Sequence, residues 1–249
     1  MMKKIELIAL VFLMLLAACS TDSDDSDDDN FDASVVCPAE GTNAYGMPNR
    51  GTIVDERDGQ EYRYTTIGKQ VWMADNLNYD APGSIVPDCN DSGCVPNCND
   101  SGCLPYGRFY DVVKDTSIGY MSETELNKDL IKTLCPQGWH VPSRKEWEKL
   151  FDIMGEDPHN AATRLRNSDK AFYPDPKFPP GSDDCHFHAI PGGGNKNQNY
   201  FFTARYLCST QPYVDGLDIV LIYEIVDFST VSIHVNAYRY GYPIRCIKD

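Results

Sequence analysis

The sequence predicts an α+β fold in which a twisted antiparallel sheet packs against two main helices, with long loops and disulfide staples. Three observations indicate this class. Strand-like segments lie toward both ends of the chain, helix-like segments with capping signals lie between them, and ten cysteines accompany a segment typical of export. Strands before and after a helical region favour one antiparallel sheet that joins the terminal strands. An exported chain is expected to oxidise its thiols.

Residues 1–18 are predicted to be a lipoprotein signal peptide. A basic start precedes an unbroken apolar run of 12 residues, Leu7 to Ala18. A membrane-spanning helix needs roughly 20 such residues, so the run fits a secretory signal instead. Its end, Leu16-Ala-Ala-Cys19, resembles the bacterial lipobox, which implies cleavage before Cys19 and diacylglycerol on its sulfur. We therefore expect a lipid-anchored protein of the outer membrane, on its periplasmic or cell-surface face.

Residues 19–50 are predicted to be the lipidated cysteine and a disordered acidic tether. Seven aspartates lie among serines between Asp22 and Asp32. Such a segment buries too little apolar surface to offset the entropy of ordering it. Residues 51–249 remain for the folded domain.

The charge of the chain excludes one class of partner. It carries 22 Lys and Arg against 37 Asp and Glu, a formal charge of −15, and has no basic stripe. Phosphate neutralisation needs clustered cations, so no nucleic-acid partner is expected. The membrane is expected as a partner through the N-terminal lipid only.

The domain is predicted to begin with a β-hairpin. Glu61 to Ile67 is rich in β-formers and follows the turn-like Asp58-Gly59, a hairpin pattern. Gln70 to Met73 is a further short strand. A loop-rich insert with four cysteines then occupies residues 79–106.

Two helices with capping-box signals follow. Ser122 to Glu125 is expected to start the first, and Ser143 to Glu146 the second, which Gly155 ends. Their apolar faces are predicted to be Leu126, Leu130, Ile131 and Leu134, and Trp147, Leu150, Phe151 and Met154. A third helix is expected near 160–166, and strands at 219–226, 230–238 and 243–247.

Blocks of the sequence, taken in order, resemble the Fibrobacter succinogenes major paralogous domain. The blocks are Gly51–Tyr62, Ile67–Tyr79, Tyr106–Tyr110, Cys135–Trp147, Ala189–Gly193 and Ile244–Lys248. The resemblance covers residues 51–249. It implies a secreted or lipid-anchored bacterial protein, and the biochemical function of that family is not established.

Two of these blocks are also similar to the formylglycine-generating-enzyme superfamily, namely Trp139–Trp147 and Ile244–Ile247. That likeness implies a C-type-lectin-like fold with the chain ends close together, and it implies that Cys135 and Cys246 approach and form a disulfide. The cysteine pair of that superfamily lies after the corresponding helix, whereas both Cys-x4-Cys pairs here precede it. No catalytic residue is therefore carried over, and fold alone does not assign function.

Nine of the ten cysteines remain once Cys19 is set aside, and nine is an odd number. At least one cysteine is therefore free or pairs with another molecule. We expect Cys185 to pair with Cys208 and Cys37 to stay unpaired. The insert cysteines can pair within each nine-residue unit or between units; they are Cys89, Cys94, Cys98 and Cys103.

The insert also offers one candidate calcium site. Asp88, Asn90 and Ser92, followed by glycine, resemble the start of an oxygen-ligand loop. Asn99 stands where such a loop has a bidentate Glu, so a stapled loop without metal is the favoured interpretation. His186 and His188 lack a partner pair with zinc-ligand spacing, so we expect packing or surface roles for them. No other cofactor is expected.

The chain is predicted to be a binding or adhesion module for glycans or cell-surface ligands, and not an enzyme. It has no nucleophile elbow, phosphate loop or HExxH motif. A catalytic domain of the formylglycine-generating type and a structural envelope protein are the alternatives. Tyrosines of loops and late strands are candidates for sugar stacking, with core packing favoured; they are Tyr106, Tyr110, Tyr200, Tyr206, Tyr238, Tyr240 and Tyr242. The three tryptophans are expected in the core.

Overall fold

The structure is a computed structural model of the chain. It describes residues 30–86, 106–112, 127–155, 157–173, 179–192, 203–210, 220–225, 231–236 and 241–249. Several predictions lie outside these residues. They concern the signal peptide, Cys19, the four insert cysteines, the calcium candidates Asp88, Asn90 and Ser92, and three of the tyrosines.

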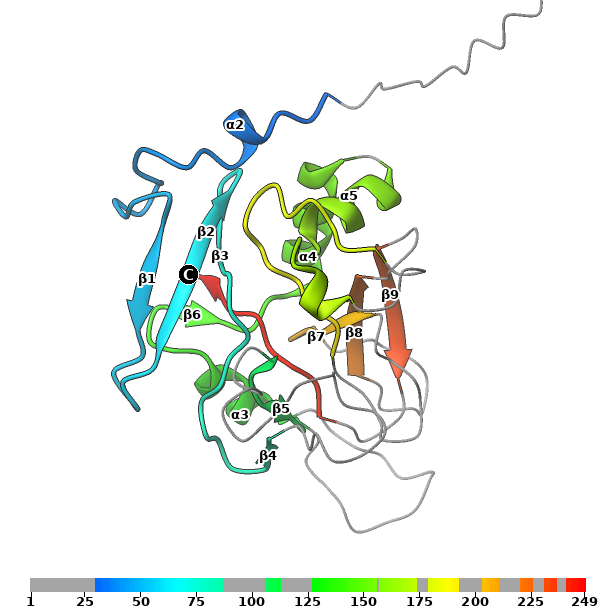
Figure 1. Cartoon of the computed structure of the whole chain (residues 1–249). Coiled ribbons are helices and arrows are strands. Elements are labelled where there is room, and N and C mark those ends of the chain that lie inside the picture. Colours follow the sequence, from blue (N-terminus) through cyan, green and yellow to red (C-terminus); the bar gives the residue numbers. More distant parts are fainter. Residues whose placement is uncertain are drawn as a thin grey trace, which may run out of the picture.

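A five-stranded antiparallel sheet with the order β1-β2-β3-β10-β6 forms one side of the molecule (Figure 1). Its strands are β1 (Arg50–Val54), β2 (Glu61–Ile67), β3 (Gln70–Met73), β6 (Trp139–His140) and β10 (Ile247–Lys248). The predicted hairpin is formed by β1 and β2. Ile247 pairs with Trp72 on one side and with His140 on the other. The last strand therefore lies between two earlier ones, as the sequence predicted for the chain ends.

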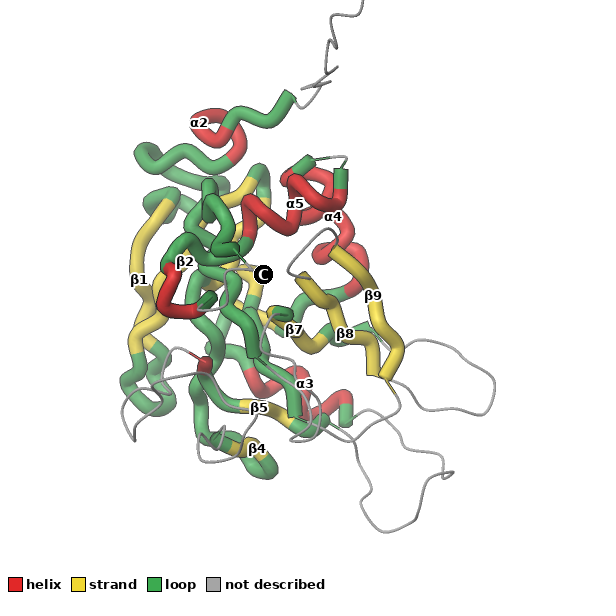
Figure 2. The backbone as a smooth tube through the Cα atoms, turned by 45° about the vertical axis from the view of Figure 1, so that its right-hand side comes forward, coloured by secondary structure: helices red, strands yellow, loops and turns green. Residues whose placement is uncertain are grey.

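A separate three-stranded antiparallel sheet contains the late strands β7 (Ala204–Leu207), β8 (Val220–Ile225) and β9 (Val231–Asn236). Figure 2 shows it on the opposite side of the molecule from the larger sheet. The prediction that all terminal strands share one sheet was therefore wrong for β8 and β9. They are consecutive antiparallel strands with a short connection, and such strands pair with each other. β4 (Ser84–Ile85) and β5 (Phe109–Tyr110) form a small third sheet.

Helix α4 (Arg144–Met154) confirms the capping-box prediction. The Ser143 backbone N–H donates to Glu146 Oε2 at 2.7 Å, and the helix ends at Gly155. All four residues of its predicted apolar face are buried. α5 (Pro158–Leu165) is the third predicted helix, and a 3-10 turn, η2, covers Lys170–Phe172.

Helix α3 (Lys128–Leu134) begins later than predicted. Asn127 caps it, because its side chain accepts a hydrogen bond from the Leu130 N–H at 3.0 Å. The Asn127 N–H in turn donates to the Val112 carbonyl at 2.7 Å. An Asn at this position satisfies a backbone donor that the first turn leaves unpaired, so the candidate box at 122–125 does not start this helix.

The core between the two sheets is aromatic. Trp72 and Trp147 are fully buried with ring centroids 4.8 Å apart, and Phe187 contacts both. The described tyrosines of the sugar-stacking set are also buried, which confirms core packing for Tyr106, Tyr110, Tyr206 and Tyr242. Trp139 is buried as well, as predicted for all three tryptophans.

The tether prediction was wrong for residues 30–50, which pack on the domain. This segment contains the short helix α2 (Ala33–Val36), and the Val36 carbonyl accepts from the Gly68 N–H at 2.7 Å. Cys37 is 1% exposed and forms a disulfide with Cys185. The error came from the acidic composition of residues 22–32, which led us to extend the tether too far. Phe31, Ala33 and Val36 are partly buried and pack against the core. Among the described residues, no helix is long and apolar enough to cross a membrane.

Candidate functional site

A pocket of about 620 Å³ opens beside the larger sheet. Its wall comes from residues of the segments 60–63, 74–78 and 167–172, and from His188, Ile190 and Arg245. Most of these side chains are polar, and Phe172 supplies an aromatic ring. A concave site with converging polar groups is the usual form of a small-ligand site. We therefore take this pocket as the candidate functional site.

Arg245 lies at the base of the pocket and is only 1% exposed. Its Nε and Nη2 donate to Asn76 Oδ1 at 3.1 and 2.7 Å, and Nη2 also donates to the Tyr206 hydroxyl at 3.1 Å. Nη1 donates to the carbonyls of Met73 and Phe187. These acceptors are neutral, so the guanidinium is held by hydrogen bonds rather than by a contacting carboxylate. It joins four chain segments beneath the pocket.

Arg63 and Asp75 form a bidentate ion pair on the pocket wall. The Asp75 carboxylate also accepts from the Arg63 backbone N–H at 2.7 Å. Burial acts to raise the pKa of Asp75, but the hydrogen bonds from Arg63 and the charges of Arg63 and Arg245 outweigh it and hold that pKa below its usual value. Asp75 is therefore an anion whose charge is already balanced.

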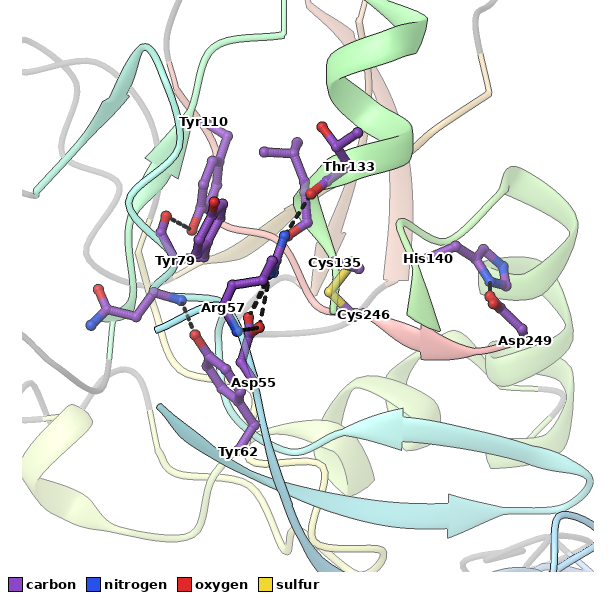
Figure 3. Close-up of a disulfide and its surroundings, with 12 residues drawn as sticks. Asp55, Arg57, Tyr62, Tyr79, Tyr110, Thr133, Cys135, His140, Cys246 and Asp249 are labelled. Atoms are coloured by element: carbon purple, nitrogen blue, oxygen red, sulfur yellow. Dashed lines mark hydrogen bonds and ion pairs between the residues drawn. A yellow bond between two sulfur atoms is a disulfide. The ribbon is translucent and has the colours of Figure 1, made fainter. Parts of the chain in front are cut away.

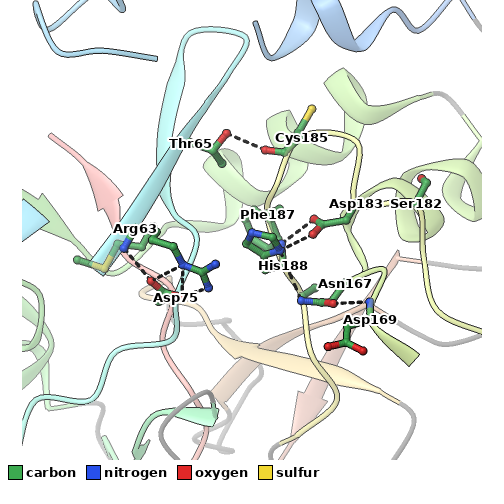
Figure 4. A network of polar contacts seen from close by, with 12 residues as sticks. Arg63, Thr65, Asp75, Asn167, Asp169, Ser182, Asp183, Cys185, Phe187 and His188 are labelled. Atoms are coloured by element: carbon green, nitrogen blue, oxygen red, sulfur yellow. Dashed lines mark hydrogen bonds and ion pairs between the residues drawn. The ribbon is translucent and has the colours of Figure 1, made fainter. Parts of the chain in front are cut away.

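Asp183 and His188 form a second pair at the pocket (Figure 4). The Asp183 carboxylate accepts from the His188 backbone N–H at 2.8 Å and contacts Nδ1 of the ring. Its side chain is 4% exposed, against 21% for His188. Asn167 Nδ2 lies 3.4 Å from the same Nδ1. The imidazole is thus fixed from one side by a buried carboxylate.

The segment that carries this pair has unusual backbone geometry. Asp183, His186 and His188 have φ angles of 54°, 55° and 54°, in the left-handed region that is uncommon for non-glycine residues and that Asn, Asp and His adopt more often than the others. Among the described residues, all non-glycine residues with positive φ lie here. Such strain persists only where surrounding contacts impose it, and it concentrates at functional sites.

Those contacts are visible on both sides of the segment. The Cys37–Cys185 disulfide ties it to the N-terminal segment. The Cys185 carbonyl accepts from the Thr65 hydroxyl at 2.7 Å, and the His188 carbonyl accepts from Arg245 at 3.3 Å. The strained loop is therefore held by a covalent bond, the sheet and the buried arginine.

A second disulfide joins Cys135 to Cys246, the pairing that the family resemblance implied. It lies beside Arg57, which donates to the carbonyls of Thr133 and Leu134 at the end of α3 at 2.6 and 2.8 Å (Figure 3). Asp55, whose side chain is 1% exposed, holds the same guanidinium. This cluster fixes the β1–β2 turn to the end of α3, and none of its members lies in the pocket wall.

The predictions that Cys185 pairs with Cys208 and that Cys37 stays unpaired were both wrong. Cys185 pairs with Cys37, and Cys208 is a buried free thiol whose pKa is raised by its burial. The error came from treating Cys37 as part of a flexible tether. Cys37 lies in the ordered segment, 148 residues before its partner, a separation that sequence spacing does not indicate.

A polar cluster near the C-terminus lies away from the pocket wall. His140 contacts Asp249 through Nδ1 at 2.7 Å and Glu146 through Nε2 at 2.9 Å. Burial acts to raise the pKa of Glu146, but hydrogen bonds from His140 and Ser143 outweigh it and lower the pKa to about 2. The cluster ties the last residue to α4 and is a structural element.

No group of three or more His, Cys, Asp or Glu side chains suited to a metal ion occurs in the part of the chain that the structure describes.

Sequence reasoning named His188 only as a packing or surface residue, and it did not name Arg63, Asp75, Asp183 or Arg245. The available signal was the family resemblance, because Asp75 lies in its block Ile67–Tyr79 and Arg245 in its block Ile244–Lys248. The other residues lie on a loop and a sheet face with no diagnostic spacing.

The family model for the Fibrobacter succinogenes major domain matches residues 65–248. No curated protein and no solved structure matches the chain at a significant level. The match includes every pocket residue except four, Gln60 to Arg63. The comparison thus covers the segments that build the pocket base.

Proposed function

Because the chain belongs to the Fibrobacter succinogenes major domain family and has an open polar pocket, we propose that it is a binding module for a neutral saccharide. The observation that carries this proposal is the chemistry of the pocket wall. Carboxylate, guanidinium and amide groups line the same pocket as the Phe172 ring. Such groups exchange hydrogen bonds with hydroxyls, and an aromatic ring packs against the apolar face of a sugar.

The charges of the pocket favour a neutral ligand. Glu61, Asp75 and Asp169 oppose Arg63 and Arg245 in the wall, and the Arg63–Asp75 pair neutralises itself directly. The whole chain has a formal charge of −15, so a polyanionic ligand would be repelled at long range. A neutral polysaccharide, which is rich in hydroxyls, carries no charge that the wall would have to balance and is not repelled by the protein at long range.

The test is retention on insoluble neutral polysaccharides, followed by calorimetry with soluble oligosaccharides of the retaining type. Phe172→Ala should weaken binding, because it removes the ring from the wall. Tyr45→Ala is the matched control, since Tyr45 is an exposed aromatic residue outside the pocket. If the wild-type protein, with Cys37–Cys185 and Cys135–Cys246 intact, is retained by no polysaccharide of a broad panel, the proposal fails.

The proposal includes a location and a fold type. A lipid on Cys19 would hold the module at the outer membrane, where it would serve adhesion to glycans or other cell-surface ligands, and its domain would be of the C-type-lectin-like kind. The lipobox resemblance at Leu16–Cys19 supports the anchor. In cells, Cys19→Ala should abolish incorporation of labelled palmitate and move the protein from the membrane to the soluble fraction. Unchanged labelling of this variant would refute the anchor.

A further inference from the structure

The histidine of the pocket has the arrangement of a proton acceptor. Asp183 contacts Nδ1 of His188 and also accepts from the His188 backbone N–H. A carboxylate in this position holds the proton on Nδ1, so Nε2 keeps its lone pair. Within the described part of the chain, Nε2 forms no hydrogen bond, and His188 belongs to the pocket wall. The free nitrogen is therefore available to a group bound in the pocket.

The surroundings of this pair are fixed before any ligand binds. Asp183 and His188 both have φ angles of 54°, and Arg245 holds the carbonyls of Phe187 and His188 from below. Backbone strain of this kind requires support from the fold. A packing histidine would need neither a buried carboxylate on its ring nor a strained backbone. Pre-organisation of a ring and its carboxylate is what general base catalysis requires.

We propose that His188 is a general base that activates water to hydrolyse an acyl ester of the saccharide bound in this pocket, with Asp183 as the positioning residue. This activity rests on the proposed saccharide binding. It goes beyond the expectation of a non-catalytic module, which depended on the absence of sequence motifs. An Asp and a His five residues apart on an irregular loop match no such motif.

The proposed reaction balances with water as the only co-reactant. Nε2 takes a proton from water, and the oxygen forms a bond to the ester carbonyl carbon. The tetrahedral intermediate collapses with cleavage of the bond from the acyl carbon to the sugar oxygen, and the imidazolium returns its proton to that oxygen. The products are a carboxylic acid and a free hydroxyl.

Two features of the site favour an ester over a glycosidic bond. Hydrolysis of a glycosidic bond uses a pair of carboxylates with distinct roles. Of the three carboxylates in the wall, Asp75 is committed to Arg63 and Asp169 caps η2 by accepting from the Ala171 N–H, which leaves Glu61 alone without a side-chain partner among the described residues. Ester hydrolysis needs a base and a donor to the developing oxyanion. Asn167 Nδ2, 3.4 Å from the Nδ1 that Asp183 already holds, makes only a long contact there. Under the proposal, this amide would be the donor to the oxyanion.

The experiment measures acetate release from acetylated xylan and cleavage of 4-nitrophenyl acetate by the full chain. His188→Gln should reduce kcat/KM by about 100- to 10,000-fold, the usual contribution of a general base. Asp183→Asn should reduce it too, because an amide can hold the ring in the wrong tautomer. His159→Gln is the matched control, since His159 is exposed, lies on α5 and is outside the pocket wall.

A split of kcat from KM separates catalysis from structural damage. His188→Gln should lower kcat far more than it raises KM, because the imidazole acts on the attacking water while the rest of the pocket wall still holds the saccharide. A wild-type protein without activity above buffer, or a folded His188→Gln variant with wild-type activity, overturns the proposal. Binding of each variant to deacetylated xylan is measured in parallel. Retention without hydrolysis refutes the general base alone, whereas absence of both refutes the proposed function.

Discussion

Removal of the Cys37–Cys185 disulfide should destabilise the domain and free its N-terminal segment. The perturbation is the double variant Cys37→Ala/Cys185→Ala, which leaves no unpaired thiol at the site. The bond joins the segment after α2 to the strained loop between Asp183 and His188. Both sulfurs are buried, so the bond belongs to the core rather than to the surface.

The expected magnitude follows from the length of chain that the bond closes. The two cysteines are 148 residues apart, for which the chain-entropy model gives about 5 kcal/mol at 25 °C. Residual structure in the unfolded chain reduces this value, so we expect a loss of about 3–5 kcal/mol. The denaturant m-value should rise, because the unfolded chain exposes more surface without the cross-link.

The assay is guanidinium denaturation together with limited proteolysis of the folded protein. Cys135→Ala/Cys246→Ala is the matched control, since that bond closes a loop of similar length, with a sequence separation of 111. Both variants should lose similar stability, but only the first should become cleavable within residues 30–50 and lose saccharide binding. A loss of unfolding free energy below about 1 kcal/mol, together with unchanged proteolysis, would refute the reasoning.

Glu146→Gln should cost at most about 3 kcal/mol at pH 7 by urea denaturation, because hydrogen bonds from His140 and Ser143 keep the pKa of Glu146 at about 2. Because the pKa of Glu146 in the folded state is depressed, its contribution to the free energy of unfolding is present above about pH 4.5 and is lost as pH falls toward 2. The difference in unfolding free energy between the variant and the wild type should therefore disappear in acid. Asp55→Asn should cost about 3 kcal/mol in the same assay, since it breaks an ion pair on a carboxylate that is 1% exposed; an unchanged midpoint would contradict this. Gly107→Ala should lower Tm more than Gly59→Ala: both glycines have positive φ, but a Cβ at Gly107 meets a backbone carbonyl oxygen and one at Gly59 meets nothing. Equal Tm shifts would show that only conformation matters.

The parts of the fold that the sequence predicted correctly are those with a local physical cause. In α4, the Ser143–Glu146 box and the apolar face from Trp147 to Met154 both act within a few residues, and the structure has both. The β1–β2 hairpin follows from β-formers beside a Gly-containing turn. Such signals depend on neighbours in the chain and not on the rest of the fold.

The parts that it missed depend on contacts between distant residues. The Asp183–His188 loop has no periodicity, and its conformation is imposed by Cys37, Thr65 and Arg245. The candidate site could not be predicted from the sequence for the same reason, because its wall combines segments that become adjacent only after folding. A disulfide partner 148 residues away is indicated by no local pattern, which explains both the wrong partner for Cys185 and the misplaced domain boundary.

The block Ile244–Ile247 shows why the pocket and the fold form together. Ile244 and Arg245 are buried, Cys246 is bonded to Cys135, and Ile247 pairs with both β3 and β6. Arg245 supplies the pocket base only when this block lies between those strands, because its acceptors come from β3, the Phe187 loop and β7. A chain that has not inserted its C-terminal strand therefore lacks the base of the pocket, and its buried acceptors have no donor.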